Sequence, residues 1–336
     1  MTVRIAINGF GRIGRNMFRI MEKKNPDVEV VAINDLASKD NLAYLLKYDS
    51  VHGRFDGEVE ATEKGLKING KDIEVLSIKD PAELPWAEMN VDIVVEATGV
   101  FTKREQLEKH LEAGAKKVAL TVPAKDKVDK TIVFGVNDDE LSKDDKIVSN
   151  ASCTTNCLAP MAKVLNDEFG IEKGIMTTIH AYTSSQGILD LPASKIRRGR
   201  AAAENLIPTT TGAAIATTKV LPELKGKIDG MAIRVPLPDG AIVDGVFSLE
   251  KDVTVEDVNN AFRKAAAGDM KGILGYTEEE IVSRDILGLD YSSYIDGLST
   301  MVVAGNQVKV LSWYDNEWGY SNRVLELVLF MHELGY

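Results

Sequence analysis

Two cysteines are the most reactive side chains in the sequence, and they lie four positions apart. Cys153 and Cys157 belong to a segment that follows an apolar run and starts a helical pattern. Ser152 is expected to cap this helix, which places Cys153 in its first turn, where free N–H groups and the helix dipole favour a thiolate. Cys153 is therefore a candidate nucleophile. Cys157 is expected to pack as a small apolar residue, and taken alone the pattern also fits two buried structural cysteines.

A thiol nucleophile needs a proton acceptor, and the chain has four histidines. His52 lies in a glycine-flanked loop, His110 on a charged amphipathic helix and His332 in the terminal helix. His180 ends an apolar strand pattern, so it can face a helix N-terminus of the same domain and move a proton to or from a substrate oxygen. A structural histidine is the alternative here. With so few histidines and cysteines, no metal site is expected.

A glycine motif near the N-terminus predicts a dinucleotide site. Residues 9–14 have the form G-x-G-x-x-G, directly after an apolar strand pattern and at the start of a helical one. Gly9 allows the tight turn, Gly11 lets a pyrophosphate approach the backbone, and Gly14 permits close packing of helix and strand. The helix N-terminus supplies N–H groups for the phosphates.

An acidic residue after the next strand indicates which dinucleotide is preferred. Asp35 lies 21 positions after Gly14 (35 − 14 = 21). A carboxylate there accepts hydrogen bonds from an adenosine ribose and repels the 2′-phosphate of NADP. The alternative is a structural turn followed by a solvated aspartate. The combined pattern favours NAD.

The first third of the chain alternates short apolar runs with amphipathic segments. This rhythm predicts a parallel sheet covered by helices, with a hairpin-like excursion at 54–78 near the sheet edge. Helices are expected at 12–24 and 104–113. The expected strands are 3–8, 28–33, 93–97, 118–120, 132–134 and 147–149.

From about residue 150 the pattern changes to longer alternating runs with fewer helices between them. A helix is expected at 154–169 and a last one at 320–334, and residues 183–206 form a long segment with a basic cluster. The expected strands are 175–180, 231–235, 242–249, 301–303 and 308–314. Such long strands favour an α+β domain with a mixed or antiparallel sheet.

Composition limits the class of protein. The chain has 336 residues, 44% hydrophobic and 27% charged, with a formal net charge of −11. These values exclude disordered, collagen-like and disulfide-scaffold proteins and suggest two domains. No apolar run approaches the ~20 residues of a membrane helix, and the first residues enter a strand pattern without a signal sequence. We therefore expect a cytoplasmic protein that binds neither nucleic acid nor membranes.

Several segments resemble phosphorylating glyceraldehyde-3-phosphate dehydrogenases of the NAD-dependent, bacterial and eukaryotic type. They occur in the family's order over nearly the whole chain. They are NGFGRIGR (8–15), ASCTTNCLAP (151–160), HAYT (180–183), PTTTGAA (208–214), RVP (234–236) and WYDNE (313–317).

The resemblance implies a fold and a reaction. A Rossmann-type α/β domain of residues 1–150 plus 317–336 would bind NAD, and residues 151–316 would form an α+β catalytic domain with a mixed or antiparallel sheet. The protein would be a homotetramer. Cys153 would attack the aldehyde of D-glyceraldehyde 3-phosphate, and His180 would move the proton. The thioester formed after oxidation would react with inorganic phosphate to give 1,3-bisphosphoglycerate.

The resemblance also implies binding residues. Leu191 and Pro192 resemble the NAD-preferring form of the family. The positions that match NAD contacts are Arg12, Ile13, Asp35, Lys79, Thr98, Gly99, Thr121 and Asn316, beside the three motif glycines. The positions that match substrate or phosphate contacts are Ser152, Thr154, Thr183, Arg198, Thr211, Gly212 and Arg234. Hydroxyl, backbone N–H and guanidinium groups are the donors that phosphate oxygens require.

The sequence departs from the family pattern at a few positions near these residues. Leu237 stands where the family usually has threonine, Thr121 where serine is usual, and Ala181 where serine is frequent. None of them touches the cysteine–histidine chemistry. The nearest alternative is an erythrose-4-phosphate dehydrogenase of the same fold, which would transfer its acyl group to water. A non-catalytic NAD-binding protein is a second alternative, which the presence of both Cys153 and His180 argues against.

Overall fold

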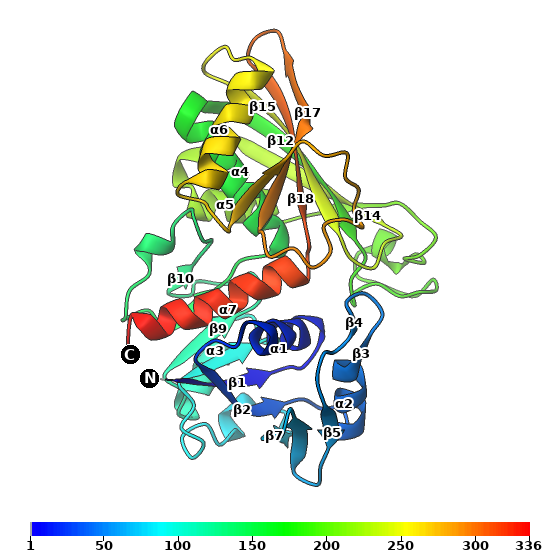
Figure 1. Ribbon diagram of the computed structural model, residues 1–336, viewed down its shortest axis with the longest axis vertical. Helices are drawn as coiled ribbons and strands as arrows, with labels where there is room; N and C mark the ends of the chain where they lie inside the picture. The colour runs from blue at the N-terminus through cyan, green and yellow to red at the C-terminus, as the bar shows by residue number, and fades with distance from the viewer. Residues whose placement is uncertain (1) are drawn as a thin grey trace. The chain divides into compact units, whose positions relative to one another are not determined.

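The computed structural model describes residues 2–336, which divide into two compact units (Figure 1). Unit 1 holds the chain up to Ile132, Asp139–Ala151 and Ser321–Tyr336. Unit 2 holds Val133–Asp138 and Ser152–Tyr320. No helix within residues 2–336 has the length and apolar character needed to cross a membrane.

Unit 1 is built on a nine-stranded sheet in the order β10-β11-β9-β8-β1-β2-β7-β6-β5. The strands from β10 to β7 are parallel, whereas β6 is antiparallel to both β7 and β5. The antiparallel edge confirms the predicted excursion at 54–78. The bounds are β1 Val3–Asn8, β2 Val28–Asn34, β5 Val59–Ala61, β6 Gly65–Ile68, β7 Lys71–Leu76, β8 Ile93–Glu96, β9 Lys117–Leu120, β10 Lys130–Thr131 and β11 Ile147–Ser149, with a separate small pair β3 Tyr48–Asp49 and β4 Gly53–Arg54.

The chain order of the strands reverses at β1, which pairs with β2 on one side and β8 on the other. The last residues of these three strands, Asn8, Asn34 and Glu96, are register partners across the sheet. In open parallel sheets, ligands bind in the crevice beyond the carboxyl ends of the strands at such a reversal. The fold of unit 1 therefore points to this edge as a binding site.

The helices of unit 1 cover the sheet because its strands are apolar on both faces. All four residues of both β8 and β9 are buried, as expected for central parallel strands. One core cluster centres on Trp86 and a second on Leu107. The helices are α1 Arg12–Lys24, α2 Lys39–Lys47 and α3 Arg104–Glu112, with short 3-10 turns η1 Pro81–Glu83 and η2 Asp138–Glu140.

The last helix, α7 Trp318–Glu333, lies with unit 1 from Ser321 onward. Ser321 donates from Oγ to the carbonyl of Ile13 over 3.4 Å. Lys24 donates from Nζ to Oδ1 of Asn322 over 2.6 Å. The carboxyl end of the chain is thus held against the helix that follows the glycine motif.

Unit 2 contains a seven-stranded mixed sheet in the order β13-β14-β12-β15-β18-β17-β16. Two neighbouring pairs are parallel, β12 with β14 and β16 with β17, and the others are antiparallel. This confirms the predicted mixed sheet. The bounds are β12 Ile171–Ala181, β13 Ile207–Thr210, β14 Ile228–Val235, β15 Ala241–Leu249, β16 Leu274–Thr277, β17 Ser293–Val303 and β18 Gln307–Tyr314.

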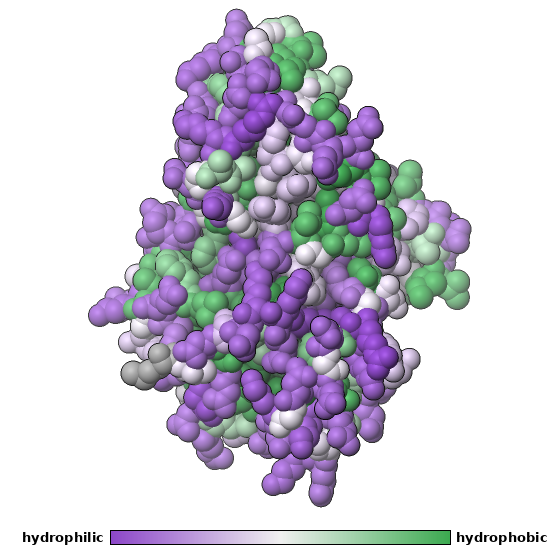
Figure 2. Space-filling view, in the orientation of Figure 1, coloured by the Kyte–Doolittle hydropathy of each residue, from purple (hydrophilic) through white to green (hydrophobic). Residues whose placement is uncertain are grey.

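Three helices cover one face of the unit 2 sheet (Figure 1). Burial alternates along β15, so one face of that strand is core and the other is more open. Ile175, Met231, Met301 and Val303 remain exposed on strands of this sheet, and Figure 2 shows apolar surface on this unit. The helices are α4 Cys153–Phe169, α5 Ala213–Val220 and α6 Val255–Ala267, with 3-10 turns η3 Ile196–Gly199 and η4 Pro222–Leu224.

The strand predicted at 132–134 is wrong. The strand here, β10, is only Lys130–Thr131, and the chain then turns. Ile132 still donates to the carbonyl of Ser149 over 2.9 Å, but the N–H of Val133 donates to the side chain of Asn137 over 2.9 Å. Ile132 and Val133 are buried beneath this turn. Their apolar character therefore reflects burial in a loop, which an apolar pattern alone does not distinguish from a strand.

Candidate active site

Cys153 is the first residue of α4, at the end of a sharp turn from β11. Ser152 caps the helix as predicted, because its Oγ accepts from the N–H of Thr155 over 3.1 Å. Asn156 adds a second bond, from Nδ2 to the carbonyl of Ser152 over 3.0 Å. Ala151 has a φ of 54°, a left-handed conformation that costs a non-glycine residue roughly 1–2 kcal/mol. The turn therefore presents Cys153 at the helix N-terminus at an energetic cost.

His180 comes from β12 and reaches the cysteine. Its Nε2 lies 3.4 Å from Sγ of Cys153, within hydrogen-bond distance for sulfur. The imidazole is 4% exposed, whereas Cys153 is only partly buried. The structure thus brings together the two residues predicted from the sequence as nucleophile and proton acceptor.

Arg234 completes this group because β12 and β14 run parallel with His180 and Arg234 in register. Its NH1 lies 2.9 Å from Nδ1 of His180 and donates to the carbonyl of Ala181 over 2.7 Å. Nδ1 of His180 is also 2.7 Å from that carbonyl oxygen. The Nε of Arg234 is buried and, within residues 2–336, has no hydrogen-bond partner. It is a guanidinium donor available to a ligand.

Burial controls the charges of the pair. Burial, together with the positive charges of Arg234 and Arg198, lowers the pKa of His180 to about 3. Burial also raises the pKa of the Cys153 thiol, while Arg234 and hydrogen bonds from Thr154 oppose that rise. This differs from the thiolate expected from the helix N-terminus, because removing the thiol from water outweighs the dipole. The ligand-free chain therefore favours a neutral thiol beside a neutral imidazole.

Two hydroxyl residues and a tyrosine support the pair, and sequence reasoning assigned a role only to Thr154. The phenol oxygen of Tyr314, the last residue of β18, lies 2.8 Å from Oγ1 of Thr154 and 2.8 Å from Oγ1 of Thr178. Its ring meets that of His180 edge to face, with centroids 5.8 Å apart. Thr178 lies two positions before His180 on one strand face, which is the only sequence signal for it. Tyr314 could be placed only by the pairing of β15 with β18.

The other predicted substrate residues make local bonds. Arg198 donates from Nε to Oγ1 of Thr209 over 2.9 Å, on β13. Oγ1 of Thr211 accepts from the N–H of Ala213 over 3.2 Å at the start of α5, and Gly212 is the exposed cap of that helix. Thr183 shares a 2.9 Å hydrogen bond with Ser185 in the loop after β12. The structure thus places hydroxyl and guanidinium donors on β13, α5 and this loop.

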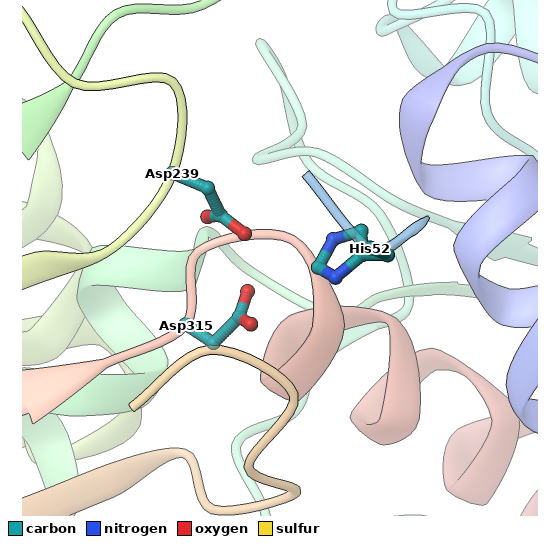
Figure 3. A group of neighbouring side chains, drawn as sticks. All are labelled: His52, Asp239 and Asp315. Atoms are coloured by element: carbon teal, nitrogen blue, oxygen red, sulfur yellow. The ribbon is translucent and has the colours of Figure 1, made fainter. Parts of the chain in front are cut away.

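A carboxyl pair follows the strand that carries Arg234. The carboxyl groups of Asp239 and Asp315 point toward one another (Figure 3). Asp315 accepts backbone hydrogen bonds from Glu317 over 2.9 Å, Trp318 over 2.6 Å and Gly288 over 2.8 Å. Burial and the charges of Asp315 and Glu317 raise the pKa of Asp239 to about 10. Asp239 therefore keeps its proton at neutral pH.

A pocket of about 410 Å³ lies within unit 1 at the carboxyl ends of the central strands. This volume is in the range of small-molecule sites. Five residues predicted as NAD contacts line it, namely Gly9, Gly11, Asp35, Lys79 and Thr98. Sequence reasoning missed seven others, which follow the same strands: Asn8, Asn34, Leu36, Ile78, Ala97, Val100 and Phe101.

The chemistry of this pocket fits NAD. Gly9 has a φ of 93°, and a Cβ there would lie 2.6 Å from the backbone nitrogen of Thr98. A Cβ on Gly11 would meet nothing within 4 Å, so that backbone is open to a ligand. The carboxylate of Asp35 is fixed by the N–H groups of Phe10 at 2.8 Å and Ala37 at 2.9 Å. Its remaining lone pairs can accept ribose hydroxyls.

The remaining predicted NAD residues have other partners or positions. Arg12, next to Ile13 in the first turn of α1, forms an ion pair with Asp49. Although burial raises the pKa of Asp49, hydrogen bonds from Arg12 and two backbone N–H groups lower it to about 2. Thr121 donates from Oγ1 to the carbonyl of Glu96 over 3.0 Å.

Gly14, Gly99 and Asn316 are the other residues predicted to contact NAD. A Cβ on Gly14 would lie 2.5 Å from the carbonyl oxygen of Gly9, so this glycine allows α1 to pack against the turn. Gly99 is exposed, with a φ of 70°. Asn316 lies in unit 2, and its buried Oδ1 has no hydrogen-bond partner within residues 2–336. That oxygen could accept from a ligand amide.

Comparison with known proteins identifies the family of both parts of the chain. Residues 3–104 match the family model described as "Glyceraldehyde 3-phosphate dehydrogenase, NAD binding domain", and residues 152–316 match the corresponding C-terminal domain. The chain is 60% identical over 336 residues to glyceraldehyde-3-phosphate dehydrogenase of Geobacillus stearothermophilus and 61% to that of Priestia megaterium, covering all of each chain. It is 57% identical to the protein of that name from Streptomyces coelicolor, over 98% of this chain and 99% of the relative.

Proposed function

Because the chain belongs to the glyceraldehyde-3-phosphate dehydrogenase family, we propose that it oxidises D-glyceraldehyde 3-phosphate with NAD and inorganic phosphate to 1,3-bisphosphoglycerate. The observation that supports this most directly is the contact of 3.4 Å between Sγ of Cys153 and Nε2 of His180 at a helix N-terminus. A positioned thiol–imidazole pair is the arrangement that nucleophilic catalysis on a carbonyl requires.

The first step forms a carbon–sulfur bond. We propose that neutral His180 carries its proton on Nδ1 and donates it to the carbonyl oxygen of Ala181, 2.7 Å away, while NH1 of Arg234, 2.9 Å from the same Nδ1, donates to that carbonyl over 2.7 Å. Nε2 then carries a lone pair toward Cys153 and takes the thiol proton as sulfur attacks the aldehyde carbon. The aldehyde oxygen receives that proton, giving a thiohemiacetal on Cys153.

The second step oxidises this carbon. Bound NAD would supply the two-electron acceptor for the hydrogen of this carbon. His180 takes the hydroxyl proton at Nε2 at the same time, so a thioester remains on Cys153. An oxygen of inorganic phosphate then attacks the thioester carbon, the carbon–sulfur bond breaks, and the sulfur leaves as a thiolate that His180 reprotonates.

We also propose roles for the two domains and for the cofactor and substrate residues. We assign NAD binding to residues 1–150 with 317–336, and catalysis to residues 151–316. Arg234 is proposed as a donor to substrate oxygens, since its buried Nε has no partner within residues 2–336. Asn316 is the proposed NAD contact from unit 2. Arg198 and the hydroxyl or N–H groups of Ser152, Thr154, Thr183, Thr211 and Gly212 are proposed to bind the substrate phosphate and inorganic phosphate.

We also propose a homotetramer in the cytoplasm. Exposed apolar side chains on the open face of the unit 2 sheet and in the segment 188–206 support self-association, because monomers rarely expose such residues together. Among them are Ile175, Ile188, Leu189, Ile196 and Met231. Sedimentation at micromolar concentration tests this proposal, which a monomer would contradict.

The reaction is tested by following NADH formation by purified protein with glyceraldehyde 3-phosphate and NAD, with and without inorganic phosphate. Sustained turnover only when phosphate is present is the expected result. Steady turnover without phosphate would mean that water accepts the acyl group, as in an erythrose-4-phosphate dehydrogenase. No NADH under either condition would overturn the proposal.

A further inference from the structure

Beneath the pocket of unit 1 lies a buried carboxylate that the proposed mechanism does not use. Glu96 is the last residue of β8 and is 0% exposed. Its Oε1 accepts from the N–H of Thr98 over 2.9 Å and from the hydroxyl of the same residue. Its Oε2 is 2.6 Å from Nδ2 of Asn8 and 3.1 Å from Nε2 of His110. The two oxygens therefore meet four donor groups.

The donors around His110 determine the direction of its hydrogen bond with Glu96. The N–H of the Trp86 indole can only donate, and it lies 3.1 Å from Nδ1 of His110. Nδ1 is thus the acceptor, so Nε2 carries a hydrogen and donates it to Glu96. Glu96 therefore meets a donor at each of these contacts, and both of its oxygens accept.

The same hydrogen bonds continue across the floor of the pocket. Oδ1 of Asn8 accepts from Nδ2 of Asn34 over 2.7 Å. Asn34 in turn forms a pair of 2.9 Å bonds with the backbone of Ile78, donating to its carbonyl and accepting from its N–H. Asn8, Asn34, Ile78 and Thr98 all line the pocket. Glu96 and His110 lie below it and are fully buried.

The turn at residues 98–100, called the Thr98 turn below, connects Glu96 to the glycine motif. The hydroxyl of Thr98 donates to Glu96 and accepts from the N–H of Val100 over 3.1 Å, which fixes the turn. A Cβ on Gly9 would lie 2.6 Å from the Thr98 nitrogen, so the two turns are already in close contact. Any displacement of the Thr98 turn therefore alters the space beside Gly9.

We propose that Glu96 is a positioning residue for the cofactor, which holds the Thr98 turn and the end of β1 in the geometry that binds NAD without touching NAD itself. His110 supports it by donating one hydrogen bond from α3. This inference rests on the proposed function, because it takes the pocket of unit 1 as the NAD site.

The principal test is Glu96→Gln, which keeps the shape and replaces one acceptor oxygen by a donor. At least one buried donor then loses its partner or the turn moves. We expect the Kd of NAD, measured by titration calorimetry, to rise about tenfold, the usual scale for one unsatisfied buried group. We expect kcat at saturating NAD to change less than about twofold, because no reacting atom is affected.

A matched control lies at the other end of the same strand. Asp92 directly precedes β8 and is also buried, accepting from the N–H of Arg4 over 2.9 Å and pairing with Lys116 at 2.6 Å. Asp92→Asn removes a buried carboxylate at the amino end of β8, whereas the pocket lies at the carboxyl ends of the strands. Its Kd for NAD is expected to match that of the wild type. An equal rise in both variants would overturn the proposal, since general destabilisation would then explain it.

A second pair of variants carries the test if Glu96→Gln does not fold. His110→Leu removes the donor to Glu96, whereas His110→Gln can still present an N–H there. We expect His110→Leu to raise the Kd of NAD several-fold and His110→Gln to recover most of the affinity. Equal Kd values for both variants and the wild type would contradict a positioning role.

The Thr98 turn provides a test of coupling. Glu96→Gln and Thr98→Val should each raise the Kd of NAD by some factor. If Glu96 acts through this turn, the product of these two factors exceeds the factor measured for the double variant. If the factor for the double variant equals that product, the two changes act independently, and the proposed action of Glu96 through the Thr98 turn is overturned. A wild type that fails to bind NAD would refute the proposed function. If the wild type binds NAD and a folded Glu96→Gln variant binds it with the same Kd, only this inference is refuted.

Discussion

The cofactor pocket of unit 1 and the cysteine site of unit 2 are built from different parts of the chain. The pocket is made by residues that end or follow neighbouring parallel strands, and the backbone of Gly11 is open to a ligand. The cysteine site is made by side chains from distant elements, with Cys153 on α4, His180 on β12 and Arg234 on β14. We expect the open backbone of the unit 1 pocket to bind a ligand, whereas the converging side chains of unit 2 carry out the reaction.

The two regions also differ in how charge is handled. In unit 2 burial perturbs the reacting groups, lowering the pKa of His180 and raising that of Cys153. Such shifts cluster where chemistry occurs. In unit 1 the two oxygens of the buried Glu96 side chain accept from four donor groups, so its hydrogen bonds are made within the protein. Changes in unit 2 are therefore expected to affect kcat, and changes in unit 1 to affect NAD affinity.

The largest effect is expected for Cys153→Ser. The hydroxyl is a much weaker nucleophile than a thiol, so kcat should fall by about 10⁴-fold or more while the Kd of NAD stays unchanged. Steady-state kinetics and calorimetry measure the two quantities. The matched control is Cys157→Ala one helical turn away, where burial raises the pKa of the native thiol to about 12 and keeps it unreactive. Activity retained by Cys153→Ser would remove the basis of the comparison.

His180→Asn is expected to lower kcat by about 10²-fold, the usual contribution of a positioned acid–base group. It should also slow the alkylation of Cys153 by iodoacetamide at neutral pH, because the neutral imidazole 3.4 Å from Sγ can take the thiol proton as sulfur attacks and asparagine cannot. The pH dependence of the alkylation rate in variant and wild type measures this loss. An unchanged profile together with near-normal kcat would mean that His180 is only structural.

Two glycines of the motif provide a sharper test of unit 1. A Cβ on Gly11 meets nothing within 4 Å, so Gly11→Ala should leave stability within about 0.5 kcal/mol but raise the Kd of NAD about tenfold by occupying the approach to the backbone. A Cβ on Gly14 would lie 2.5 Å from the carbonyl oxygen of Gly9, so Gly14→Ala should lower the free energy of unfolding by about 1–3 kcal/mol. Denaturant unfolding and calorimetry separate the two, and identical behaviour of both variants would contradict the assignment.

The last prediction concerns stability in unit 2 and depends on pH. The pKa of Asp239 is raised to about 10, so between about pH 4 and that value the folded chain binds more protons than the unfolded chain. The free energy of unfolding contributed by this group is therefore fully present below about pH 4 and falls as the pH rises through this window. Asp239→Asn is neutral at every pH, so the variant should be more stable than wild type by about 1–3 kcal/mol at pH 8 and equal to it near pH 4. Denaturant unfolding at both pH values checks this, and a gain at pH 4 as large as at pH 8 would exclude the carboxyl proton as the cause.

Local features of both sites were predictable because their causes lie within a few residues. The spacing of Gly9, Gly11 and Gly14 after a strand follows from the needs of a tight turn and close packing. The start of α4 at Cys153 follows from the capping serine before it. The alternation of apolar runs likewise indicated the α/β and α+β character of the two units.

Other features required the tertiary structure. The contact of Arg234 with His180 depends on β12 and β14 being parallel neighbours in register, although 54 positions separate the two residues. The role of Tyr314 depends on the pairing of β18, and the raised pKa of Cys153 depends on the burial that packing creates. Similarly, His110 lies in a helix that looks solvent-exposed in sequence, yet it is fully buried beside Glu96 and Trp86.

The amino-acid sequence by itself determined the turns, the helix starts and the residue types that can perform this chemistry, because those depend on backbone preferences over short distances. Only the tertiary structure decided which of these side chains meet and how their protons are held. Strand pairing joins residues that are remote in the chain, and the exclusion of water, which sets the energy of every buried charge, exists only after the chain has folded.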